Sequence, residues 1–97
     1  MIPEKDYLEL LNENFGIKFT TCESSNIFAY AFKPGKDTKT GTLFIAFKVG
    51  KIYAYQKVPK EVFANLERAE SKGKFVNANI VKESYKFFKY AIQENNK

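Results

Sequence analysis

The feature that most constrains the fold is a stretch of alternating side chains between residues 26 and 56. Apolar residues recur there at every second position, which is the period of a β-strand. The alternation runs over three segments, 26–33, 42–49 and 52–56, separated by a polar segment at 34–41 and by a tight-turn pair, Gly50-Lys51. The pattern predicts a three-stranded antiparallel meander. A sheet this small must bury a face against other elements to be stable in water.

Apolar residues at helical spacing flank this stretch on both sides. The helices predicted in this way cover residues 3–15, 59–70, 74–80 and 82–94. The sequence therefore predicts a single α+β domain over residues 1–97. In this arrangement an N-terminal helix precedes the three-stranded antiparallel meander, and two or three further helices pack on one sheet face.

The absence of histidine excludes several kinds of catalysis. The 97 residues, enough for one domain, include no His and a single Cys. Ser-His and Cys-His nucleophiles, a zinc site made by this chain alone and a disulfide are therefore excluded. Cys22 has no basic residue close enough in sequence to activate it, and the carboxylates predicted on helices are typical of solvated surfaces. We expect no catalytic residue, no metal and no cofactor, and hence a protein that is not an enzyme.

The same features indicate a compartment. One unpaired thiol fits a reducing environment, and the first residues lack the basic flank and apolar run of a signal peptide. No stretch approaches the roughly 18 apolar residues that span a bilayer. We expect a cytoplasmic protein that does not engage membranes.

The charge of the chain favours anionic partners. Lys and Arg number 16 against 11 Asp and Glu, which gives a formal net charge of +5 and a pI of about 9.3. Acidic residues prevail over residues 1–24 and lysines over 33–60, so a basic face is expected on the middle of the chain. Lysines kept for solubility alone would give the same balance.

The first candidate site is a group of tyrosines with a lysine beside them. Tyr53 and Tyr55 share one face of the third predicted strand, Tyr30 lies on another strand, and Lys51 adjoins the pair. Aromatic rings and cations on a sheet face can stack bases and neutralise phosphates, each stacked base contributing about 1–3 kcal/mol. Alternatively, the rings pack beneath the helices as part of the core. Alternation that is apolar on both faces leaves both interpretations open.

The second candidate site lies around the break between two predicted helices. Its residues are Ser71, Lys72, Lys74, Asn77 and Lys82. A helix start offers unpaired N–H groups and a positive dipole end, which attract anions, and the lysines would add charge. The spacing of a Walker phosphate loop is missing. The alternative is an ordinary helix–helix corner in which Asn77 caps or bridges the backbone.

Several short motifs follow one another in the order and spacing of a known small module. They include Gly41-Thr42-Leu43, Tyr53-Ala54-Tyr55, Ser71-Lys72-Gly73 and Phe75-x-Asn77-x-x-Ile80. Between about residues 25 and 85 the chain resembles the KTSC domain family, which is named after a module at the C-terminus of some lysyl-tRNA synthetases. The family also occurs as stand-alone bacterial and phage proteins. The resemblance implies RNA binding.

The chain departs from the family in three respects. It has a longer turn at 34–40, and it lacks the arginines that are common between the two tyrosines and after Ile80. The predicted helices at 3–15 and 82–94 are additions to the KTSC-like core.

Together these observations predict a non-catalytic binding module for a phosphate-bearing ligand, either single-stranded nucleic acid or a free nucleotide. Two alternatives stay open. A phage-type protein would sequester a host nucleotide immune signal, in a site shaped between the protomers of a homo-oligomer. A protein–protein adaptor or inhibitor would use the aromatic surface and contact its partner through the N-terminal helix.

Overall fold

A five-stranded antiparallel sheet forms the centre of the fold. A computed structural model describes residues 4–48 and 50–91. In chain order the elements are α1 (Glu4–Phe15), β1 (Thr20–Thr21), β2 (Ile27–Pro34), β3 (Thr40–Phe47), β4 (Lys51–Pro59), α2 (Lys60–Arg68), α3 (Lys72–Asn79), the 3-10 helix η1 (Val81–Glu83) and β5 (Phe87–Ala91). The strands lie in the sheet in sequence order, and each is antiparallel to its neighbours. The α+β class and the central meander β2–β3–β4 are confirmed.

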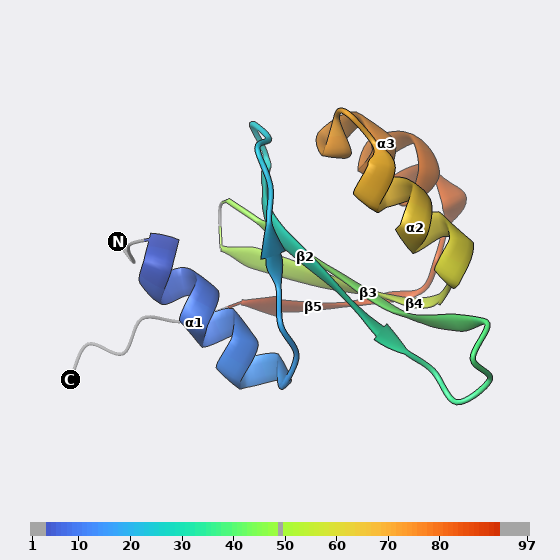
Figure 1. The fold of residues 1–97 in the computed structure, drawn as a ribbon, viewed down its shortest axis with the longest axis horizontal. Helices are drawn as coiled ribbons and strands as arrows, with labels where there is room; N and C mark the ends of the chain where they lie inside the picture. The colour runs from blue at the N-terminus through green and yellow to red at the C-terminus, as the bar shows by residue number, and fades with distance from the viewer. Residues whose placement is uncertain (1–3, 49, 92–97) are drawn as a thin grey trace.

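Both faces of the sheet are buried, by different helices. On β3, Leu43 and Ile45 pack with Leu66 of α2 and Val76 of α3. The alternate residues Phe44 and Ala46 pack instead with Tyr7 and Leu11 of α1. Figure 1 shows α1 on one side of the sheet and α2 and α3 on the other. The strands are apolar on both faces for this reason, and the later helices do share one face, as predicted.

One close approach in the sheet requires a glycine. A Cβ added to Gly41 of β3 would lie 2.7 Å from Cζ of Phe32 and closer still to the carbonyl oxygen of Lys33. The Phe32 ring cannot simply move aside, because it stacks on Phe63 of α2 with ring centroids 4.9 Å apart and planes 10° apart. Gly41 therefore lets β2 and β3 pair at this point while α2 packs over them.

The helix predicted over 82–94 is wrong for the residues that the structure describes. Val81–Glu83 form the 3-10 helix η1, Ser84 turns the chain with a left-handed φ of 60°, and Phe87–Ala91 form β5. The physical reason is the open edge of β4, whose backbone groups would otherwise lack partners on that side. β5 pairs with β4 from Lys51↔Ala91 to Tyr55↔Phe87. Residues 92–94 of the predicted helix lie outside the described residues.

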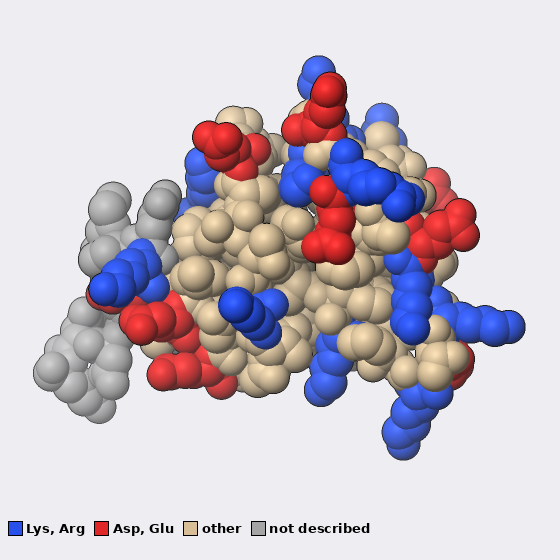
Figure 2. All heavy atoms as spheres, viewed as in Figure 1, with Lys and Arg blue, Asp and Glu red and all other residues tan. Residues whose placement is uncertain are grey.

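Charge is distributed unevenly over the surface. Figure 2 shows acidic side chains gathered over α1 and lysines projecting around the turn between β2 and β3. This agrees with the acidic first segment and basic middle of the sequence. Within residues 4–48 and 50–91, no helix is long and apolar enough to cross a bilayer.

Candidate functional site

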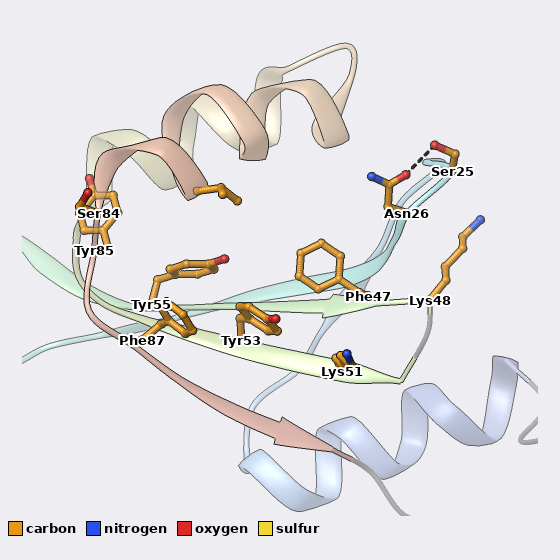
Figure 3. A pocket seen from close by; sticks show the side chains of 11 residues that line it. Ser25, Asn26, Phe47, Lys48, Lys51, Tyr53, Tyr55, Ser84, Tyr85 and Phe87 are labelled. Carbon is orange, nitrogen blue, oxygen red and sulfur yellow. Dashed lines mark hydrogen bonds between the residues drawn. The ribbon is translucent and has the colours of Figure 1, made fainter.

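An aromatic pocket lies on the sheet face that α2 and α3 share, beyond the part that these helices cover. It has a volume of about 450 Å³. Its lining residues are Ser25, Asn26, Phe47, Lys48, Lys51, Tyr53, Tyr55, Val81, Ser84, Tyr85 and Phe87. Figure 3 shows rings from β3, β4 and β5 side by side along its floor, with the segment before β2 at one end and the turn before β5 at the other.

The floor of the pocket is built by aromatic stacking across strands. The rings of Tyr53 and Phe87 stack with centroids 5.2 Å apart and planes 10° apart. Phe47 meets Tyr53 edge-on at 5.5 Å, and Tyr55 lies tilted against Phe87, also at 5.5 Å. The strand register causes this arrangement, because Tyr55 is directly opposite Phe87 and residues on the same face of paired strands touch. The pocket therefore presents a preformed aromatic surface.

The rings differ in how far a ligand could reach them. Phe87 is 46% exposed and Tyr53 is half-buried, whereas Tyr55 is only 4% exposed. Burial, followed by the neighbouring Tyr53, raises the pKa of Tyr55 to about 12, so its phenol stays protonated at neutral pH. Tyr53 and Phe87 offer the accessible surface, and the buried Tyr55 packs against both of them.

The two lysines that line the pocket lie at one end of it. Lys48 and Lys51 are both exposed and flank the turn that joins β3 to β4, and Figure 3 shows Lys48 extending towards Ser25 and Asn26. The hydroxyl of Ser25 donates to Oδ1 of Asn26 over 2.7 Å. Lys89 of β5 adds a third cation to this face, since it is the cross-strand partner of Tyr53. The pocket thus has an aromatic middle and a basic, hydrogen-bonding end.

The structure brings together three residues of the first candidate site and separates the fourth. Lys51, Tyr53 and Tyr55 line the pocket. Tyr30 is only 4% exposed and packs edge-on against Phe63 of α2, with centroids 6.0 Å apart. Burial is the main cause that raises the pKa of Tyr30. Tyr30 belongs to the core beneath α2 and is absent from the pocket lining.

The second candidate site forms a corner between α2 and α3. The hydroxyl of Ser71 accepts a hydrogen bond from the backbone N–H of Lys74 over 3.3 Å, which caps α3. Nζ of Lys72 donates to the carbonyl oxygens of Glu67 and Ala69, at 3.1 and 2.8 Å. These bonds are those expected of a helix–helix corner. Asn77 is exposed on α3.

None of the helix-corner residues lines the aromatic pocket. Lys82 is exposed in η1, next to the pocket residue Val81, but it does not itself line the pocket.

Several pocket residues escaped the sequence reasoning. They are Ser25, Asn26, Phe47, Tyr85 and Phe87, with Lys89 beside them. Phe87 and Lys89 lie beside Tyr53 only because β5 is a strand paired with β4. A helix, as predicted there, would not have placed them next to Tyr53. Phe47 could have been found, because it occupies the same strand face as Ile45 and Leu43.

Comparison with known proteins identifies the scaffold that carries this pocket. A family model described as the KTSC domain matches residues 23–87. The chain belongs to the KTSC domain family. The match confirms the resemblance seen in the sequence and includes all eleven lining residues, whereas α1 and the last residues of β5 lie outside it.

Two relatives of the KTSC domain support this assignment. A protein of Tsukamurella paurometabola is 42% identical over 64 residues, which are 66% of this chain and 88% of that protein. The crystal structure of a KTSC domain protein from Yersinia pestis is similar with a TM-score of 0.61 and 26% identity, over 78% of this chain and 97% of that chain. The KTSC core is thus shared in both sequence and fold.

Proposed function

We propose that this KTSC protein is a non-catalytic binding module for a nucleotide unit, either free or within a single strand. The observation that carries the proposal is the stacked Tyr53–Phe87 pair, which forms the floor of an open pocket with Lys48 and Lys51 at one end. A nucleotide has the same two parts, a flat base and a charged phosphate. Aromatic stacking does not discriminate strongly among bases, so it suits a general binder.

The two ends of the pocket favour one orientation of the ligand. The base would lie on the rings of Tyr53 and Phe87, and the phosphate would lie towards Lys48 and Lys51. Lysine suits this role because its ammonium group is a mobile point charge for phosphate rather than a fork for reading base edges. Ser25 and Asn26 offer hydroxyl and amide groups for the sugar or the base edge.

The titratable groups favour binding over catalysis. Burial raises the pKa of the Cys22 thiol, although Lys72 and Lys48 oppose this effect, and the thiol lies 3.8 Å from the carbonyl oxygen of Ile27. A thiol with a raised pKa is a poor nucleophile at neutral pH. The buried Tyr55 phenol, with its pKa of about 12, stays protonated at neutral pH and so cannot act as a base.

Calorimetric titration with three probes tests the proposal: adenosine, adenosine monophosphate, and a single-stranded RNA of eight nucleotides. We expect adenosine monophosphate to bind more tightly than adenosine, because only the former engages the lysines. Tyr53→Leu should weaken the binding of all three probes, whereas Lys51→Gln should weaken only the two probes that carry phosphate. Lys36→Gln, in the turn between β2 and β3, removes one charge away from the pocket and serves as the control.

Salt dependence separates the two forms of the ligand. A strand that contacts several lysines loses affinity steeply with salt, with a slope of about −0.7 per phosphate neutralised. A free nucleotide held in one pocket should lose much less. If no probe binds, or if Tyr53→Leu binds all three as tightly as the unmodified protein, the pocket is not a nucleotide site.

A further inference from the structure

The outer edge of β5 has the properties of a docking site for another strand. All five of its residues are exposed, and Phe87, Phe88 and Tyr90 keep 46%, 59% and 45% of their surface in water. The opposite edge of the sheet is the two-residue β1. A long, apolar edge strand can pair with a further strand, and proteins commonly prevent such pairing with short edge strands or charged side chains.

The backbone register shows which groups the edge offers. The N–H of Gln56 in β4 donates to the carbonyl oxygen of Lys86 over 2.7 Å, so these two residues form a hydrogen-bonded pair. Because such pairs alternate along an antiparallel ladder, Phe88 and Tyr90 also direct their backbone groups towards β4. Phe87, Lys89 and Ala91 direct theirs outwards. Among the described residues, no strand lies beyond β5 to receive these groups.

The side chains on this edge define the chemistry of a matching strand. Lys89 lies on the pocket face opposite Tyr53, whereas Phe88 and Tyr90 lie on the α1 face opposite Ala54 and Ile52. The segments 51–59 and 84–91 contain lysines and no carboxylate. An added strand would therefore meet a cation on one face and exposed aromatic rings on the other.

We infer that the β5 edge binds an extended peptide segment of a protein partner, in which acidic and apolar residues alternate. The acidic residue would lie across from Lys89, and the apolar residues would cover Phe88 and Tyr90. This is strand addition, in which backbone hydrogen bonds supply affinity and alternate side chains supply specificity. A second copy of the chain fits less well. Self-pairing of β5 over its full length, centred on its middle residue, would set Lys89 against its own copy, and directly opposed like charges are destabilising.

The test uses an eight-residue peptide of alternating glutamate and valine, labelled with fluorescein and titrated by fluorescence anisotropy. A peptide of alternating lysine and valine is the charge control. We expect only the acidic peptide to bind. Amide hydrogen exchange measured by NMR should then slow at Phe87, Lys89 and Ala91, whereas Phe88 and Tyr90 should be protected before the peptide is added.

Two substitutions at one position separate charge from backbone pairing. Lys89→Gln removes the ammonium group but keeps the outward N–H, and we expect a severalfold loss of affinity. Lys89→Pro also removes the outward N–H, and proline is tolerated on an edge strand. We expect the affinity to fall by a further factor of about 2 to 12 because one hydrogen bond is missing. Protection at Phe88 and Tyr90 checks that β5 stays in place in both variants.

Three results would overturn the inference. The first is an absence of slowed exchange at the outward amides at a peptide concentration that saturates anisotropy. The second is equal affinity of the two peptides or of the two Lys89 variants. The third is protection of the outward amides in the protein alone, together with a dimer in sedimentation analysis, which would identify a second copy as the occupant.

Discussion

Replacing Phe87 by alanine tests the role of the pocket floor most sharply. This ring is the part of the floor that β5 contributes, stacked on Tyr53 with centroids 5.2 Å apart and tilted against Tyr55 at 5.5 Å. Phe87→Ala removes it and leaves the lysines and the tyrosines in place. If a base stacks on the Tyr53–Phe87 surface, its affinity should fall although no charged group has changed.

The structure sets the size of two losses expected for Phe87→Ala, one of stability and one of affinity. Truncating a fully buried phenylalanine costs about 3–5 kcal/mol of unfolding free energy. Phe87 already has 46% of its surface in water, so the loss should be about half, or roughly 1.5–2.5 kcal/mol. A lost base-stacking contact is worth about 1–3 kcal/mol. At 25 °C that corresponds to a dissociation constant about 5 to 150 times weaker.

Phe88→Ala is the matched control for this variant. Phe88 neighbours Phe87 on the same strand and is 59% exposed, but it faces the α1 side of the sheet. Urea unfolding should show a modest loss of stability for both variants. Calorimetry with adenosine monophosphate should show weakened binding for Phe87→Ala alone. Equal affinities of the two variants would show that the Phe87 ring does not contact the ligand.

Three further predictions address the fold and the second candidate site. Gly41→Ala should lower the free energy of unfolding by about 1–3 kcal/mol, since a Cβ would meet Phe32 and the Lys33 carbonyl. The control in urea titrations is Gly73→Ala, whose Cβ would come no closer than 3.1 Å to the Ser24 hydroxyl. Equal losses of stability in the two variants would contradict the close packing around Gly41. The pKa of Tyr55 is raised to about 12 in the folded protein, so its stabilising effect is complete below pH 10 and is lost as the pH rises towards 12. In thermal melts over that pH range, the melting temperature should therefore decline less for Tyr55→Phe than for the unmodified protein. An equal decline would argue against the burial of the Tyr55 phenol. Lys72→Ala should leave nucleotide affinity unchanged. It should cost up to about 1 kcal/mol of stability, because the Lys72 ammonium group donates hydrogen bonds to two backbone carbonyls. A marked loss of affinity in calorimetry would instead indicate that the corner between α2 and α3 binds the nucleotide.

The sequence predicted the meander because its alternation is a local signal. Successive residues such as Leu43, Phe44 and Ile45 face opposite cores, and this period of two is visible without any knowledge of what covers each face. The same fact hid the position of α1. Strands that are apolar on both faces do not say which helix lies on which side.

The C-terminal strand could not be read locally. Tyr85, Phe88 and Ile92 recur at helical spacing, and the sequence therefore suggested a helix. What decides the matter is the edge of β4, 32 to 40 residues earlier in the chain, whose backbone groups pair with Phe87–Ala91. Such long-range pairing overrides local pattern. This one error explains why the pocket residue Phe87 and its neighbour Lys89 were missed.

Tyr53 and Tyr55 illustrate why the candidate site was only half resolved. The sequence offered two interpretations, core packing or ligand contact, and the structure shows that the two tyrosines differ in burial. Tyr55 is only 4% exposed and belongs to the core that this sheet face shares with α2 and α3, whereas Tyr53 is half-buried and stacks beside Phe87.

The measurement that tests the account most directly is a two-dimensional NMR titration of the protein with adenosine monophosphate. We predict that ring signals of Tyr53 and Phe87 and backbone amides of Lys48 and Lys51 shift together along one binding curve. Signals of Ser71, Lys74 and Asn77 should stay in place. Shifts confined to those helix-corner residues, with the rings of Tyr53 and Phe87 unchanged at saturation, would contradict the assignment of the aromatic pocket as the nucleotide site.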